Sequence, residues 1–293
     1  MAGDGPIPLF GVIGSPIGHS RSPVLHRAAY DALGFDASYD ATEVGEGGLA
    51  AFLRASPAER RGVSVTMPLK REAWLVAASR DRAAELTGAV NTLVADPVGG
   101  WARATGSNTD VAGIVGALRG VGEHTIGHVL VIGAGATAAS AVVAASDLGA
   151  SSVTLAVRSP ERAVATADLV RSLGMAAVIH PLAEVADVRA DVVISTLPGG
   201  AAMPGLPTGS LRPGSVLLDV AYSPWPSVLV EYGLDRGAAV VHGLSMLVHQ
   251  AARQVRLFAG LDDDAWAGAG DRVTRSMFDA VGLDPTGLVS RPS

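Results

Sequence analysis

A glycine-rich turn is the part of this sequence whose residue types and spacing most directly indicate chemistry. An apolar run at 128–132 leads into Gly133-Ala134-Gly135-Ala136-Thr137-Ala138, and an alanine-rich segment follows. This G-x-G-x-x-A spacing between a strand and a helix is typical of dinucleotide binding. Gly133 permits a tight turn, Gly135 lets the backbone approach a pyrophosphate, and free N–H groups of the following helix face the phosphates. We expect cofactor phosphates at residues 133–137.

The residues after the next predicted strand distinguish between possible ligands. Enzymes that bind NAD, like methyltransferases that bind S-adenosylmethionine, usually carry Asp or Glu here to bind ribose hydroxyls. This chain instead has Arg158, Ser159 and Arg162. Guanidinium groups bind phosphate in a bidentate manner, whereas cations at the start of a helix are otherwise disfavoured. We therefore expect NADP rather than NAD, the alternative being an arginine pair on the surface.

A second polar set occupies the first 110 residues. Ser20 and Ser22 precede a predicted helix, where hydroxyls and free N–H groups can hold a carboxylate; Ser22 is equally typical of a helix N-cap. Lys70 is the only lysine among 22 basic residues, and Lys, unlike Arg, can give up its proton. Asp110 could act in chemistry or cap a helix. The remaining members are hydroxyls and amides, namely Ser64, Thr66, Asn91, Thr92, Asn108 and Thr109. Together they suit a polyhydroxylated, carboxylated small molecule.

Strands that alternate with helices must position these residues, which predicts an α/β fold with mostly parallel sheets. Strands are expected at 10–13, 38–43, 62–66, 89–95, 101–105, 128–132, 152–157, 176–179, 191–195, 215–220 and 238–241. Helices are expected at 23–33 with Ser22 as N-cap, at 110–119, 137–148 and 160–173, and twice within 243–282. Residues 113–241 form a predicted Rossmann-like dinucleotide-binding domain. Residues 1–112 and 242–293 form the predicted substrate-binding domain, with the C-terminal helices returning to it.

Composition excludes several classes of protein. The chain has 293 residues, 48% of them hydrophobic, so it is not disordered. Its net charge of −6 argues against a nucleic-acid partner, and the absence of cysteine excludes a disulfide scaffold and thiolate catalysis. No apolar run reaches the length of a membrane span, and the first ten residues do not resemble a signal peptide. We expect a cytoplasmic monomer or homodimer that binds a small molecule, with no metal and no membrane partner.

Several motifs, in order along nearly the whole chain, resemble those of the shikimate dehydrogenase family. They are Gly14 to His26, Val63 to Lys70, Ala89-Val90-Asn91-Thr92, Asn108-Thr109-Asp110, Asp219-Val220-Ala221-Tyr222, and Gly243 to Gln250. The resemblance implies NADPH-dependent, reversible reduction of 3-dehydroshikimate to shikimate, a step towards chorismate and the aromatic amino acids.

The resemblance also implies a role for each matching residue. Ser20 and Ser22 would hold the substrate carboxylate, and Lys70 and Asp110 would be the catalytic pair at the reacting oxygen. Ring hydroxyls would meet Ser64, Thr66, Asn91 and Gln250, with Tyr222 near the substrate or the nicotinamide. Thr196, Leu197, Gly243 and Met246 would border the nicotinamide.

The sequence departs from the family pattern at several positions. Ser64 stands where the family usually has Asn, and the glycine-rich loop lacks the arginine often found near its end. Ser22 favours shikimate over quinate, because quinate-using relatives often carry Thr there. The alternatives are a quinate/shikimate or aminoshikimate dehydrogenase, and a non-catalytic NADP-binding regulator on the same fold. The presence of both Lys70 and Asp110 argues against the regulator.

Overall fold

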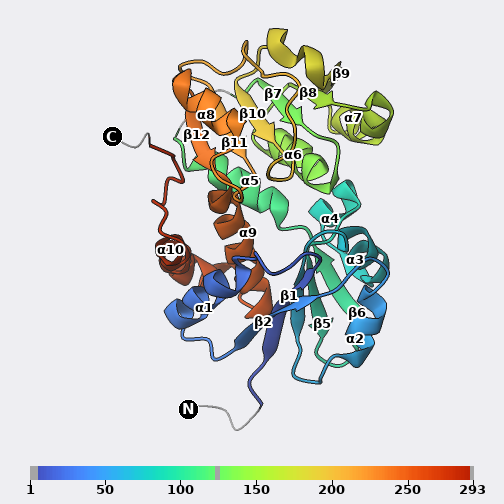
Figure 1. The fold of residues 1–293 in the computed structure, drawn as a ribbon. Helices are drawn as coiled ribbons and strands as arrows, with labels where there is room; N and C mark the ends of the chain where they lie inside the picture. The colour runs from blue at the N-terminus through green and yellow to red at the C-terminus, as the bar shows by residue number, and fades with distance from the viewer. Residues whose placement is uncertain (1–5, 123–125, 291–293) are drawn as a thin grey trace. The chain divides into compact units, whose positions relative to one another are not determined.

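The structure is a computed structural model that describes residues 6–122 and 126–290, and its fold is α/β, as predicted (Figure 1). The chain divides into two compact units. Unit 1 comprises Met1–Thr109 and Gln250–Gly282, and unit 2 comprises Asp110–His249 and Leu283–Ser293. Each unit contains one six-stranded sheet.

The sheet of unit 1 has the strand order β2-β1-β3-β5-β6-β4. Strand β5 runs antiparallel to both β3 and β6, whereas β1 is parallel to β2 and to β3. The antiparallel β5–β6 pair is a hairpin formed by the strands that were predicted at 89–95 and 101–105. The strands are β1 (Leu9–Gly14), β2 (Ser38–Glu43), β3 (Gly62–Val65), β4 (Ser79–Arg80), β5 (Thr92–Asp96) and β6 (Gly100–Ser107).

Helices cover both faces of this sheet. They are α1 (Ser22–Leu33), α2 (Leu49–Ala55), α3 (Lys70–Val76), α4 (Arg82–Thr87), the unit 1 part of α9 (Gly243–Phe258) and α10 (Asp263–Ala280). Apolar side chains of α2 and α3 pack with Ile13, Val63 and Val65 from the strands. Helices α1 and α10 lie side by side, joined by a hydrogen bond from the Ser276 hydroxyl to the Ala28 carbonyl (3.1 Å) (Figure 1).

The other face of the sheet carries an aromatic layer. Phe10 of β1 stacks on Phe258 of α9, with ring centroids 4.6 Å apart, and contacts Tyr30 of α1. His26 is fully buried in this layer and stacks on Tyr39 of β2 at 3.9 Å. Its Nδ1 donates to the Ser22 carbonyl, and burial lowers the pKa of His26 from 6.5 to about 3.

The low pKa of His26 predicts that acid destabilises unit 1. Between pH 6.5 and about 3, His26 binds a proton in the unfolded chain but not in the folded one. The contribution of His26 to the unfolding free energy is therefore fully present above pH 6.5 and is lost as the pH falls. From pH 7 to pH 5 the expected loss through His26 is about 2 kcal/mol of unfolding free energy. Urea titrations at the two pH values measure it. His26→Gln should show a smaller loss, whereas a variant of the exposed His19, His19→Gln, should match the wild type; equal losses in all three would refute the prediction.

Unit 2 has an all-parallel sheet with the strand order β12-β11-β10-β7-β8-β9. Its strands are β7 (His128–Ile132), β8 (Ser152–Val157), β9 (Ala176–Pro181), β10 (Val192–Ser195), β11 (Val216–Asp219) and β12 (Ala239–His242). Its helices are α5 (Asp110–Arg119), α6 (Ala136–Asp147), α7 (Val164–Ser172), α8 (Val228–Asp235), the 3-10 turns η1 (Pro160–Ala163) and η2 (Leu182–Asp187), and the first part of α9. This is the doubly wound order, with the strand order reversing between β7 and β10.

The units and the predicted domains divide the chain at different residues. Helix α9 crosses from unit 2 into unit 1 after His249, and the segment that follows α10 belongs to unit 2. That segment lies along β12: the His242 amide donates to the Gly287 carbonyl, and the Val289 amide donates to the Val240 carbonyl (both 2.9 Å).

Four helices were not predicted from the sequence: α2, α3, α4 and α8. Between the predicted helix at 110–119 and the predicted strand at 128–132 the sequence predicts a connector, and its residues 123–125 lie outside the described residues, as do the first five and the last three residues of the chain. Within 6–122 and 126–290, every helix is too short or too polar to cross a lipid bilayer.

Candidate functional site

The polar residues of unit 1 gather at one edge of its sheet. Strands β1, β3 and β6 end there, and β5 begins there because it runs in the opposite direction. The Val65 amide at the end of β3 donates to the Asn91 carbonyl (2.7 Å), and the Asn91 amide donates to the Ser107 carbonyl (3.0 Å). The backbone therefore brings the 63–70, 89–92 and 108–110 motifs together.

Three of the motifs meet in a buried amide cluster formed by Asn91, Thr109 and Gln250. Asn91 Oδ1 accepts the Thr109 amide at 2.9 Å, and Asn91 Nδ2 donates to Thr109 Oγ1 at 2.9 Å. Asn91 Nδ2 also donates to Gln250 Oε1 at 3.3 Å. Since all three side chains are buried, their amide and hydroxyl groups are held in fixed orientations.

A second chain of hydrogen bonds runs through Ser64. The Tyr39 hydroxyl donates to Ser64 Oγ (2.7 Å), which donates to Gln254 Oε1 (2.8 Å). Gln254 Nε2 donates to Thr92 Oγ1 (3.0 Å) and to the Asn91 carbonyl (3.2 Å). Ser64 and Asn91 were predicted from the sequence, whereas Tyr39 and Gln254, which bond to Ser64, were not. Gln254 lies four residues, about one helical turn, beyond Gln250 in α9, and this spacing was the only sequence signal for it.

Lys70 is the first residue of α3, and its position follows from a close turn at 66–69. The Thr66 amide donates to the Ile13 carbonyl at the end of β1 (2.9 Å), and the Val90 amide donates to the Lys70 carbonyl (3.0 Å). Gly14 makes the turn possible, because a Cβ there would lie 2.4 Å from Thr66 Cγ2 at a φ of +157°. Lys70 and Thr66 are both half-buried beside the Val90–Asn91 segment that precedes β5.

The predicted N-cap role of Ser22 is wrong. Helix α1 already includes Ser22, its N-cap is Arg21, and no side chain caps it. Ser20 Oγ accepts the Ser22 amide at 3.3 Å, so Ser20 partly fulfils the capping role. The Ser22 side chain is instead buried beside Tyr39, where it and Ser64 oppose the rise in the pKa of the phenol that burial causes. Ser20 and Ser22 therefore lie together at the start of α1.

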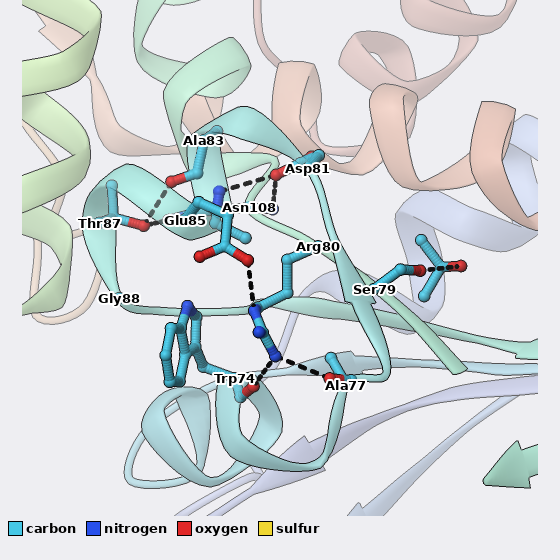
Figure 2. Close-up of polar contacts among 12 residues, drawn as sticks. Trp74, Ala77, Ser79, Arg80, Asp81, Ala83, Glu85, Thr87, Gly88 and Asn108 are labelled. Carbon is cyan, nitrogen blue, oxygen red and sulfur yellow. Dashed lines mark hydrogen bonds and ion pairs between the residues drawn. The ribbon is translucent and has the colours of Figure 1, made fainter. Parts of the chain in front are cut away.

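Arg80 binds the C-terminal end of α3, the helix that begins with Lys70 (Figure 2). Its Nη1 donates to the carbonyl of Trp74 in the last turn of α3 (3.0 Å) and to that of Ala77, the C-cap residue (2.7 Å). The guanidinium lies over the Trp74 ring at 4.3 Å, and its Nε donates to Glu85 (2.7 Å). Positive charge near a helix C-terminus stabilises the helix, so Arg80 helps to fix α3.

The next residue, Asp81, fixes the segment that leads to Asp110 (Figure 2). Asp81 is the N-cap of α4, and its Oδ1 accepts the Ala84 amide (2.7 Å) and the Asn108 amide (3.3 Å). Asn108 Nδ2 donates to the Thr87 hydroxyl at the other end of α4 (2.8 Å). Helix α4 thus holds Asn108, which precedes Thr109 of the amide cluster.

We expect Asp81→Ala to lower the unfolding free energy by about 1–2 kcal/mol, because it removes an N-cap and leaves the Asn108 amide without this acceptor. Denaturant unfolding of the purified protein measures the loss. Asp36→Ala removes an exposed carboxylate from a loop of the same unit and should change stability by less than about 0.5 kcal/mol. Equal effects of the two substitutions would show that the Asp81 contacts do not stabilise unit 1.

In unit 2 the glycine-rich turn connects β7 to α6 as predicted. The Gly133 amide donates to the Ala156 carbonyl (3.0 Å), and Thr196 Oγ1 donates to the Ile132 carbonyl (2.8 Å). Only glycine fits at 133, because φ is +116° and a Cβ would lie 2.4 Å from Thr196 Oγ1. The turn lies beside the reversal in strand order, the usual ligand position in such sheets.

A cleft of about 480 Å³ opens at this turn. Its lining includes eight of the residues predicted to bind the cofactor, namely Gly133, Ala134, Gly135, Arg158, Ser159, Arg162, Thr196 and Leu197. The volume is typical of small-molecule sites. Leu182 of η2 also lines the cleft and was not predicted. The lining does not include Ala136, Thr137, Gly243 and Met246, which lie in α6 and α9.

Two further predicted site residues belong to unit 2. Asp110 is the buried first residue of α5, and Tyr222 lies half-buried in the loop after β11. That loop is held by Asp219, a buried carboxylate that accepts the Ala221 amide (3.2 Å) and the Ser227 hydroxyl (2.6 Å). Burial raises the pKa of Asp219. Within 6–122 and 126–290, His, Asp and Glu form no group that could hold a metal ion.

Comparison with known proteins identifies relatives over almost the whole chain. Residues 12–93 match the shikimate dehydrogenase substrate binding domain. The chain is 36% identical over 273 residues to a shikimate dehydrogenase (NADP(+)) of Rubrobacter xylanophilus, covering 90% of this chain and 95% of the relative.

Solved structures give the same result. The shikimate dehydrogenase of Mycobacterium tuberculosis superimposes with a TM-score of 0.80 at 39% identity, covering 93% of this chain and 99% of that one. The shikimate 5-dehydrogenase of Thermus thermophilus in complex with shikimate has a TM-score of 0.78 at 30% identity, covering 94% and 100%. This extent of sequence and structural similarity shows that the chain belongs to the shikimate dehydrogenase family.

Proposed function

We propose that this chain is an NADP-dependent shikimate dehydrogenase that catalyses the reversible reduction of 3-dehydroshikimate to shikimate. The observation that carries the proposal is the buried cluster of Asn91, Thr109 and Gln250 beside Ser64 and the half-buried Thr66 and Lys70. A set of fixed donors and acceptors of this kind suits a ring with several hydroxyls. Family membership supports the same substrate.

The substrate contacts in this proposal follow the motifs residue by residue. Ser20 and Ser22 at the start of α1 bind the carboxylate, and Ser64, Thr66, Asn91 and Gln250 bind ring hydroxyls. Tyr222 is assigned to the substrate or the nicotinamide on the motif alone.

The cofactor residues fit NADP. A backbone turn without a Cβ at Gly133 opens on a cleft whose lining includes Arg158, Ser159 and Arg162. The two guanidinium groups and the hydroxyl suit a 2′-phosphate, and the turn suits the pyrophosphate. Gly243 and Met246 are assigned to the nicotinamide end by the resemblance.

The chemistry that this chain supplies is proton transfer and orientation. NADPH, when bound, supplies the hydride that reduces the ketone. Lys70 donates a proton to the oxygen of the reduced carbon and stabilises the charge that develops there. Asp110, assigned by the N-T-D motif, acts as its partner at the reacting oxygen.

Absorbance at the nicotinamide band tests the function. Purified protein is given shikimate with NADP or NAD, and quinate serves as the control substrate. Rapid reduction of NADP with shikimate alone is the expected result. Turnover of quinate at a similar rate would favour a quinate/shikimate dehydrogenase. NADPH binding without any turnover would overturn the proposal in favour of a regulator or an aminoshikimate dehydrogenase.

We also propose that the enzyme is cytoplasmic and acts as a monomer or homodimer, without a nucleic-acid or membrane partner. The net charge of −6 supports the absence of a nucleic-acid partner. Sedimentation of the purified protein measures the oligomeric state.

A further inference from the structure

Ser64 occupies the position where the family motif usually has Asn, and its hydrogen bonds determine what it can offer a ligand. A hydroxyl has a single proton, and Ser64 gives that proton to Gln254 Oε1. The assignment is fixed, because Gln254 Nε2 already donates to Thr92 Oγ1 and to the Asn91 carbonyl. Ser64 therefore faces a ligand as an acceptor, whereas an Asn amide could also donate.

Tyr39 completes this arrangement from the other side. Because the Ser64 proton goes to Gln254, the hydrogen bond between Tyr39 and Ser64 can only be donated by the phenol. The Ser22 side chain lies beside the same phenol. The Tyr39 hydroxyl thus lies between Ser22 and Ser64, the residues assigned to the substrate carboxylate and to a ring hydroxyl.

The phenol is held rigidly in this position. Tyr39 is opposite Phe10 in the β1–β2 register, whereas Ser64 is opposite Val12 in the β1–β3 register, so the Tyr39 side chain reaches across β1. Its ring is 7% exposed and stacks on His26 with an interplanar angle of 18°. A buried, stacked ring has little freedom to reorient, so its hydroxyl stays in one position relative to Ser22 and Ser64.

We propose that Tyr39 is a positioning residue of the substrate site, which orients Ser64 as a hydrogen-bond acceptor and holds Ser22 for the carboxylate. The inference rests on the proposed function, because it concerns the affinity for shikimate. It predicts an effect on shikimate binding and none on the cofactor.

Tyr39→Phe removes the phenolic hydroxyl and keeps the stacked ring. We expect the KM for shikimate to rise about tenfold, the effect of one lost hydrogen bond of moderate strength. We expect kcat and the KM for NADP to stay within about twofold of the wild type, because the phenolic hydroxyl is proposed to act on the substrate contacts only, and not on Lys70 or on the cofactor cleft of unit 2.

Tyr30→Phe is the matched control. Tyr30 lies in the same aromatic layer and contacts Tyr39 edge-on, and its hydroxyl is buried with no hydrogen-bond partner among the described residues. This variant removes an equivalent hydroxyl from outside the hydrogen-bond chain, so the KM for shikimate should stay at the wild-type value. Comparable thermal stability of the two variants confirms that both are folded.

A double-mutant cycle with Ser64→Ala gives a second measurement. If Tyr39 acts through Ser64, the substitution Ser64→Ala should raise the KM for shikimate less in the Tyr39→Phe background than in the wild type. Additive effects, or an unchanged KM in Tyr39→Phe when the wild type turns over shikimate, would overturn the inference alone. A wild-type protein without shikimate turnover would overturn the proposed function and this inference with it.

Discussion

Lys70→Ala is expected to lower kcat by roughly 10²–10⁴-fold, the usual contribution of a positioned acid–base group. The ammonium of Lys70 is the only side-chain amine in the chain, and it stands at the start of α3 beside the Val90–Asn91 segment. Because other residues are proposed to bind the substrate hydroxyls, the KM for shikimate should change much less than kcat. Steady-state kinetics with NADP and shikimate measure both.

Two further variants separate proton transfer from charge. Lys70→Arg keeps a cation but should fail nearly as badly, because a guanidinium does not release its proton at neutral pH. Arg71→Ala removes the neighbouring, exposed cation, which lies over the Trp74 ring at 4.4 Å, and should keep kcat near the wild-type value. An unchanged kcat in Lys70→Ala would show that Lys70 does not donate the proton.

Replacing both Arg158 and Arg162 by Ala is expected to lower kcat/KM for NADP by about 10²–10⁴-fold, while kcat/KM for NAD changes little. Each charged hydrogen bond to a phosphate contributes about 1.5–3 kcal/mol, or roughly 10–100-fold. Both arginines line the unit 2 cleft beside Ser159, and no carboxylate stands at the end of β8 to bind a ribose hydroxyl. The ratio of the two kcat/KM values reports the preference directly.

Arg171→Ala provides the control for this cofactor prediction. Arg171 is an exposed arginine near the end of α7, paired with Asp168 at 2.7 Å, and it does not line the cleft. Its loss should leave the NADP to NAD ratio unchanged. If the double variant also keeps the wild-type ratio, the phosphate is bound by other groups and the assignment of Arg158 and Arg162 is wrong.

The parts of the fold that could be predicted are those with strong local patterns. Strands β7, β10 and β11 of unit 2 are short, almost entirely apolar runs, as expected for the inner strands of a parallel sheet covered on both faces. The missed helices are short: α3 spans seven residues and α4 six. Isolated helices of that length are unstable in water, so they depend on tertiary contacts such as those of Arg80 and Asp81, which leave no periodic signal.

In the candidate site, too, the residues in local motifs could be predicted and those brought in by tertiary packing could not. Lys70, Asn91 and Gln250 lie in recognisable motifs, and the structure brings Asn91 and Gln250 into contact. Tyr39 lies in an ordinary alternating strand, and Ser64 meets Gln254 from 190 positions away in the sequence. Contacts across that separation depend on how strands and helices pack, so no spacing rule could have found them. The error at Ser22 has a similar origin, because its burial beside Tyr39 is also a tertiary effect.

The order of the segments in unit 1 also determines when the unit can be completed on the ribosome. Its sheet is synthesised first. Phe258, which covers Phe10, and Gln254, which accepts a hydrogen bond from Ser64, are made only after all of Asp110–His249. At typical rates of translation, this interval is on the order of ten seconds. During that time the aromatic face of the nascent sheet lacks its final cover, whereas almost all of unit 2 is already available to fold. For that interval the nascent chain therefore exposes apolar surface that the finished protein buries.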